Sequence, residues 1–108
     1  MNDFRTAILE LAVEDDYGLW EVLWRIKTIE PSLPEAEAVE AARKTVTDLY
    51  DRGLVELGRR SGCAWEPAPP EEIRELLSTP ASWEAPQSID EGFFIRSTAS
   101  GDNAHYHP

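Results

Sequence analysis

The segment PEAEAVEAARKTVTDLYDRGLVELG, from Pro34 to Gly58, determines the fold that this sequence predicts. Its first two-thirds place apolar side chains at the helical interval, and one side of the helix then carries Val39, Ala42, Val46, Leu49 and Tyr50. Gly53 suits the residue at which a chain leaves a helix in the left-handed conformation. Leu54 to Leu57 continues as a strand. The segment therefore predicts an amphipathic helix followed at once by a short strand.

The start of this helix and its outer face are also predictable. Ser32-Leu33-Pro34-Glu35 matches a capping box, in which the serine oxygen accepts from a free amide and Glu35 reaches back. The face opposite the apolar side is rich in acids: it carries Glu37, Glu40, Asp48 and Asp51 against Lys44 and Arg52. The exposed face of the third helix is therefore predicted to be net negative.

Two helices precede this segment. The first is predicted over about Asp3 to Val13, with Asn2 or Asp3 as its cap, and the second over about Leu19 to Ile29, ended by Glu30-Pro31. Trp20 and Trp24 lie off the main apolar arc of the second helix, so a three-helix core alone does not cover them. Either a later segment of the chain or a second copy of the chain is expected to lie on them, and the later segment is favoured.

The order helix, helix, helix, glycine, strand resembles the winged-helix branch of the helix-turn-helix proteins, and Leu49 to Leu57 carries the likeness. The resemblance implies an α+β, mainly α, fold: a three-helix core with a two-stranded antiparallel wing. Phe93 to Thr98, after the turn-like Asp90-Glu91-Gly92, is the only candidate for the second wing strand. The step from Thr98 to Gly101 is similar to the threonine-glycine spacing that follows the wing in several bacterial winged-helix families.

A single domain over residues 1–108 is expected, because the length allows only one modest core. Its predicted parts are a core (1–53), wing strands (54–60 and 93–98), an insertion (61–92) and a tail (99–108). The insertion extends the wing and contains a short helix from Pro70 to Leu77. Trp65 and Trp83 bracket that helix. They are predicted to clamp it onto the domain, in preference to forming a ligand-binding aromatic pair.

Charge restricts the partners. The 108 residues include 21 acids and 10 bases, a formal net charge of −11, which favours basic or neutral partners over nucleic acid and anionic membranes. No apolar run is long enough for a membrane span, and the single cysteine excludes an internal disulfide. A cytoplasmic protein is therefore expected.

Residues for catalysis or for holding a metal or cofactor are not recognisable. Cys63 has no basic neighbours to activate it, so a small apolar side chain is favoured over a nucleophile. His105 and His107 could approach a metal with Asp102, but their place near the chain end favours a solvated tail. We expect no enzyme activity, no cofactor and no bound metal.

Two functions remain. The favoured one is protein recognition, in which this small acidic domain binds a protein partner, a basic one by charge, as a monomer or a homodimer. The candidate contact residues are Glu37, Glu40, Lys44, Asp48, Asp51, Trp65 and Trp83. The alternative, implied by the resemblance, is a DNA-binding transcriptional regulator. Its candidate contacts are Arg43, Lys44, Arg52, Arg59, Arg60 and Arg96.

Overall fold

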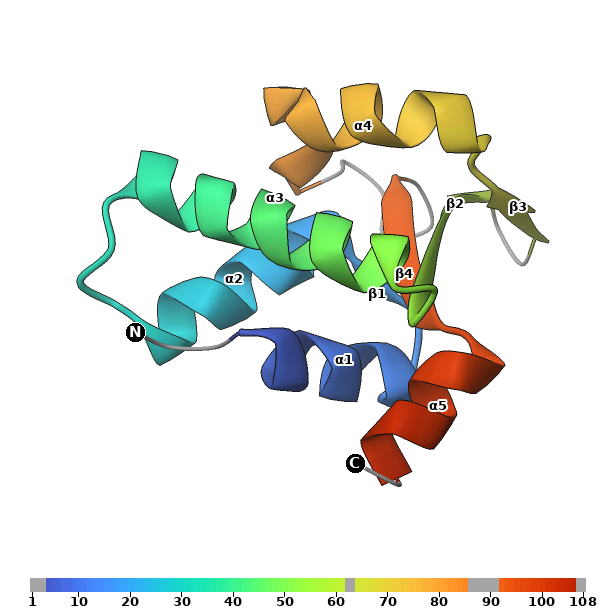
Figure 1. Ribbon diagram of the computed structural model, residues 1–108. Coiled ribbons are helices and arrows are strands. Elements are labelled where there is room, and N and C mark those ends of the chain that lie inside the picture. The colour runs from blue at the N-terminus through green and yellow to red at the C-terminus, as the bar shows by residue number, and fades with distance from the viewer. Residues whose placement is uncertain (1–3, 62–63, 86–91, 107–108) are drawn as a thin grey trace.

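The computed structural model describes residues 4–61, 64–85 and 92–106 (Figure 1). Helix α1 (Arg5–Glu14) and helix α2 (Leu19–Ile29) lie within about two residues of the predicted bounds, and those of α2 are the same. The predicted caps Asn2 and Asp3 lie outside the described residues. Between the two helices, Tyr17–Gly18 forms a two-residue strand, β1, which was not predicted. It exists because it pairs with a distant strand, and no local pattern marks it.

Helix α3 (Glu35–Asp51) confirms the central prediction, but its start differs. The predicted capping box is wrong: Pro34 is the cap residue, no side chain caps the helix, and Ser32 lies too far before the first turn. The backbone amide of Ala38 donates directly to the Pro34 carbonyl at 2.9 Å. The buried side of α3 is also rotated slightly from the predicted one. It consists of Ala38, Ala42, Thr45, Val46 and Leu49, with Val39 and Tyr50 half-buried.

The end of α3 is as predicted. Gly53 has φ of 72°, the left-handed conformation. Its amide donates to the Tyr50 carbonyl at 2.9 Å, and the amide of Leu54 donates to the Leu49 carbonyl at 3.0 Å. These are the two bonds of a Schellman motif, which satisfies the last carbonyls of a helix and turns the chain. The chain then enters strand β2 (Val55–Ser61).

The sheet is antiparallel, with the strands in the order β1-β4-β2-β3. Strand β4 (Phe93–Ser97) pairs with β2 from Val55 opposite Ser97 to Arg59 opposite Phe93, so the predicted long-range pairing is confirmed. The prediction that β4 is the only strand available to pair with β2 is wrong. Strand β3 (Ala64–Pro67) forms a hairpin on the other edge of β2, because β2 continues beyond Leu57 and needs a partner there.

The insertion packs onto the helical core. Helix α4 (Pro70–Ser78) confirms the predicted helix, and Ile73, Leu76 and Leu77 are buried. A 3₁₀ turn, η1 (Pro80–Trp83), follows and contacts α2, while α4 contacts α3. In Figure 1, α4 crosses the top of the view, on the opposite side of α3 from α1. The insertion therefore extends the same core.

The two tryptophans of the insertion have different surroundings. The Trp83 indole nitrogen donates to the Leu77 carbonyl at 2.9 Å and ties η1 to the end of α4. Trp65, on β3, lies instead beside Gly58, where an added Cβ would come within 2.6 Å of the indole ring. The predicted clamp is therefore formed by Trp83, and the assignment of Trp65 to it is wrong.

The prediction that residues 99–108 form a tail is wrong for 99–106. Residues Ala99–Tyr106 form helix α5, which contacts α1 and β4. Thr98 begins it: the hydroxyl accepts from the Gly101 amide at 3.0 Å and donates to the Gly53 carbonyl at 2.6 Å. Gly101 lies against the backbone of Leu54, so the threonine-glycine step joins α5 to the end of α3.

The flank of α2 is only partly covered. Trp20 is half-buried, but 64% of the Trp24 side chain is exposed. The expectation that the insertion covers both indoles is wrong for Trp24: η1 contacts α2 but leaves this indole exposed. The radius of gyration is 13.0 Å, the value expected for a compact chain of about 100 residues.

Candidate functional site

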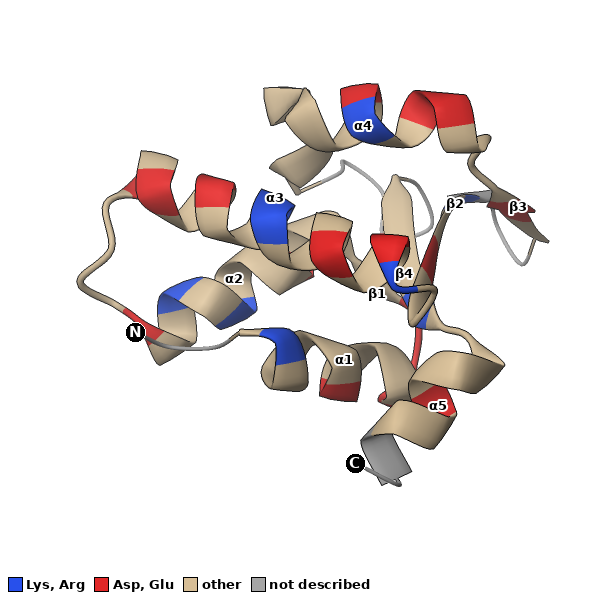
Figure 2. Cartoon of the chain, viewed as in Figure 1, with Lys and Arg blue, Asp and Glu red and all other residues tan. Residues whose placement is uncertain are grey.

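The exposed face of α3 is acidic and largely paired internally. Figure 2 shows acidic residues along the length of α3 with a basic stretch near its middle. Arg43 forms a two-pronged contact with Glu40, its Nε lying 3.0 Å from one carboxylate oxygen. That hydrogen bond lowers the pKa of the Glu40 carboxyl and raises the pKa of Arg43. Lys44 approaches the same carboxylate at 4.0 Å.

The C-terminal half of α3 is also paired. Arg52 Nε lies 3.0 Å from Asp48, and Arg5 of α1 approaches the same carboxylate at 3.3 Å. The hydrogen bond from Arg52, supported by that from Arg5, lowers the pKa of Asp48. Asp48 therefore joins α1 to α3. Asp51, one turn further on, is exposed.

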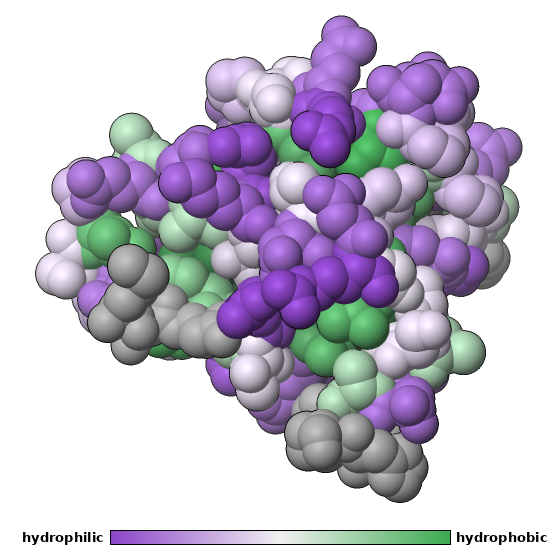
Figure 3. Space-filling model, viewed as in Figure 1, coloured by the Kyte–Doolittle hydropathy of each residue, from purple (hydrophilic) through white to green (hydrophobic). Residues whose placement is uncertain are grey.

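A groove lies beside the N-terminal half of α3. Its volume is about 510 Å³, within the range of ligand-binding clefts. The apolar part comes from Phe4 before α1, Leu33 in the loop before α3, and Ala41 on α3, with Thr45 beside them. The charged rim consists of Glu30, Glu37, Glu40 and Lys44. Figure 3 shows apolar surface beneath the hydrophilic side chains that follow α3, on the side of the N-terminus. Three carboxylates and one ammonium thus surround an apolar floor.

Three of the predicted partner-binding residues meet at this groove: Glu37, Glu40 and Lys44. Asp48 and Asp51 are not among its lining residues. Trp83 is only 4% exposed, so its assignment to a contact surface is wrong: the indole fills the core. Trp65 is half-buried beneath the Arg96 guanidinium, which lies 4.2 Å from its ring centre.

The candidate DNA contacts are engaged within the domain. Arg43, Lys44 and Arg52 approach carboxylates of α3, as described above. On the sheet, Arg59 lies 5.0 Å from the ring centre of Phe93, and Arg96 pairs with Glu56 on the neighbouring strand. The side chain of Arg60 lies outside the described part of the chain. A DNA phosphate would have to compete with each of these internal contacts.

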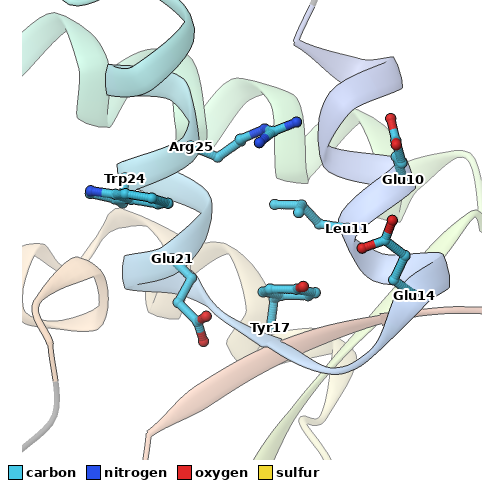
Figure 4. Close-up of a pocket in the computed structure, with 7 residues that line it drawn as sticks. All are labelled: Glu10, Leu11, Glu14, Tyr17, Glu21, Trp24 and Arg25. Carbon is cyan, nitrogen blue, oxygen red and sulfur yellow. The ribbon is translucent and has the colours of Figure 1, made fainter.

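A second hollow, which the sequence did not indicate, lies between α1 and α2 (Figure 4). Its volume is about 310 Å³. The lining residues are Glu10, Leu11 and Glu14 of α1, Tyr17 of β1, and Glu21, Trp24 and Arg25 of α2. One feature of the sequence points toward this hollow: Trp24 is predicted to lie off the apolar arc of its helix.

Metal and membrane sites are not found in the described residues. Across residues 4–61, 64–85 and 92–106, no three His, Cys, Asp or Glu side chains are grouped to hold a metal ion. Cys63, His107 and the side chain of His105 lie outside the described residues. Asp102 accepts a hydrogen bond from the Ser97 hydroxyl. Within the same ranges, no helix has the length and apolar character needed to cross a bilayer.

Comparisons with protein-family models, with curated proteins and with solved structures gave no match.

Proposed function

We propose that this chain is a non-enzymatic interaction domain whose α3 groove binds a basic, amphipathic segment of a protein partner. One observation carries the proposal: the groove, about 510 Å³ in volume, has an apolar floor, and three of the four charged groups on its rim are acidic. Amphipathic helices bind in grooves of this kind through apolar anchors. A lysine beside those anchors would meet Glu37.

The electrostatics support a basic partner. Arg43 and Lys44 already approach Glu40, whereas Glu37 makes no ion pair with another described residue. A chain of net charge −11 attracts cationic partners over distances comparable to the Debye length, about 8 Å at physiological salt, and speeds their association. Mutating rim charges should therefore change the association rate, and blocking the floor should change the dissociation rate.

We also propose a winged-helix-like arrangement. Its support is the antiparallel pairing of β2 with β4 directly after three helices, together with the glycine turn at Gly53. In this proposal β3, α4 and η1 are an elaboration inserted between the two wing strands. Such an arrangement hosts different functions, so it does not by itself select one.

The test measures binding of a fluorescein-labelled amphipathic peptide of leucine and lysine by fluorescence anisotropy. Ala41→Arg places a long cationic side chain on the groove floor and should weaken binding at least tenfold, about 1.4 kcal/mol. Ala36→Arg is the matched control, because Ala36 is an exposed residue of the same helix and does not line the groove. Equal weakening by both variants would mean that net charge alone drives binding, and the groove would be rejected.

A DNA-binding regulator is the second candidate, and the pairing of β2 with β4 as a wing is the observation in its favour. Mixed-sequence duplex DNA, titrated at low salt, tests it. We expect no appreciable affinity, and Glu37→Lys with Glu40→Lys should create weak binding. Micromolar affinity of the unmodified chain near physiological salt, falling steeply as salt rises, would establish the regulator instead.

A further inference from the structure

The hollow between α1 and α2 exposes an aromatic side chain that the fold does not use. Trp24 is 64% exposed, whereas Leu23 and Ile26 on the same helix are buried. Figure 4 shows Leu11 between the two helices, with Tyr17 below it and Trp24 across the hollow. The hollow therefore has an apolar base and two aromatic rings. At about 310 Å³ it is at the small end of ligand sites, with room for one long side chain.

Within the described residues, the carboxylates around this hollow lack the ion pairs found on α3. Within the described residues, Glu10 and Glu14 make no ion pair and no side-chain hydrogen bond. One oxygen of Glu21 accepts from the Gly18 amide at 3.1 Å. Arg25 lines the same hollow, yet it forms no ion pair with these three carboxylates, and its Nε is buried without a partner. The lining charges sum to about two negative units.

This arrangement is unfavourable for α1. Glu10 and Glu14 are four residues apart in a helix, a spacing at which like charges repel and destabilise the helix. Both lie in the C-terminal half of α1, near the negative end of the helix dipole, and the last turn holds no basic residue. Neither carboxylate therefore stabilises α1, and a cation bound between α1 and α2 would reduce their mutual repulsion.

We propose that this hollow receives one lysine or arginine side chain of a protein partner. The charged group would lie over the Trp24 indole, the aromatic face that attracts cations most strongly, and its aliphatic stem would pack on Leu11. Glu14 and Glu21 supply the carboxylates for charge-assisted hydrogen bonds. A second copy of this chain is a poor occupant, because each copy brings a net charge of −11. The site shares no lining residue with the α3 groove and does not depend on the function proposed for that groove.

The test uses NMR titration with a capped peptide, Ac-Gly-Gly-Arg-Gly-Gly-amide, and its glutamate analogue. The Trp24 indole N–H signal is assigned by its loss in Trp24→Phe. The arginine peptide should shift this signal saturably, and the glutamate analogue should not. Equal shifts with both peptides would overturn the proposal. A Trp24 signal that moves on diluting the protein alone would do the same, because it would indicate a second copy at this surface.

Charge variants sharpen the test. Glu14→Gln with Glu21→Gln should weaken arginine-peptide binding at least fivefold, while a glutamine at 21 can still accept from the Gly18 amide. Glu71→Gln with Glu75→Gln, two exposed residues of α4, is the control of equal charge change. Arg25→Gln should strengthen binding at least twofold by removing the competing cation. The proposal fails if the control pair weakens binding equally, or if Arg25→Gln weakens it.

The two sites can be separated. Ala41→Arg, which blocks the α3 groove, should leave the Trp24 titration unchanged. Loss of leucine-lysine peptide binding in that variant, with the Trp24 response intact, would support both sites as independent. A Trp24 response that disappears in Ala41→Arg would show that the arginine peptide binds at the groove, and this inference would be rejected.

Discussion

Replacing Trp83 by alanine should cost a large part of the folding free energy. Trp83 is 4% exposed, belongs to the main core cluster and donates to the Leu77 carbonyl at 2.9 Å. Truncating a buried tryptophan typically costs about 3–5 kcal/mol, and here the change also leaves a carbonyl without its donor. Native proteins are stable by only about 5–15 kcal/mol in total, so Trp83→Ala should remove a substantial part of the folding free energy.

Urea unfolding followed by far-ultraviolet circular dichroism measures this effect without depending on tryptophan fluorescence. Trp24→Ala is the matched control, because its indole is 64% exposed and its loss should change stability by no more than about 0.5 kcal/mol. If Trp83→Ala is too unstable to purify, Trp83→Phe keeps most of the ring and should lose about 1–3 kcal/mol, mainly from the unpaired carbonyl. A loss below about 1 kcal/mol in Trp83→Ala, or equal losses in both alanine variants, would refute the reasoning that the insertion is part of the core.

Two further predictions concern α5 and the acidic face of α3. Gly101→Ala would place a Cβ 1.9 Å from the Leu54 carbonyl oxygen. We therefore expect the free energy of unfolding to fall by about 1–3 kcal/mol and amide exchange in α5 to become faster. Unchanged stability would mean that α5 does not pack against Leu54. The pKa of Asp48 is lowered in the folded state. Asp48 therefore stabilises the fold at pH values above its unfolded-state pKa, and this stabilisation is lost as the pH falls through its folded-state pKa. Arg52→Gln should therefore flatten the fall in stability between about pH 5 and pH 2, measured by urea unfolding at each pH, and an unchanged slope would contradict the role of this pair.

Features that depend on neighbouring residues were predictable. Helix α2 has the expected bounds because proline at position 31 disfavours helical geometry in the residue before it. Gly53 adopts the left-handed conformation because glycine does so without steric cost. The pairing of β2 with β4 was predictable for a different reason, since each strand alone would leave its backbone groups without partners.

Features that depend on distant residues were missed. Strand β1 has two residues and exists through β4, and β3 exists through the free edge of β2. Helix α5 is short and only weakly amphipathic, and its first turn is anchored to Gly53 and Leu54 through Thr98 and Gly101. None of these anchors is local.

The candidate sites divide in the same way. The sequence by itself determined the negative charge of the chain, the acidic outer face of α3 and the departure of Trp24 from the apolar arc, because composition and the helical period do not depend on packing. The tertiary structure alone decided that Phe4 and Leu33 complete an apolar floor beside Glu37 and Glu40. It also decided that Trp83 is core while Trp24 stays exposed among Glu10, Glu14 and Glu21. The physical reason is that a groove exists only where separate helices meet, and how the helices meet is set by packing of the whole core.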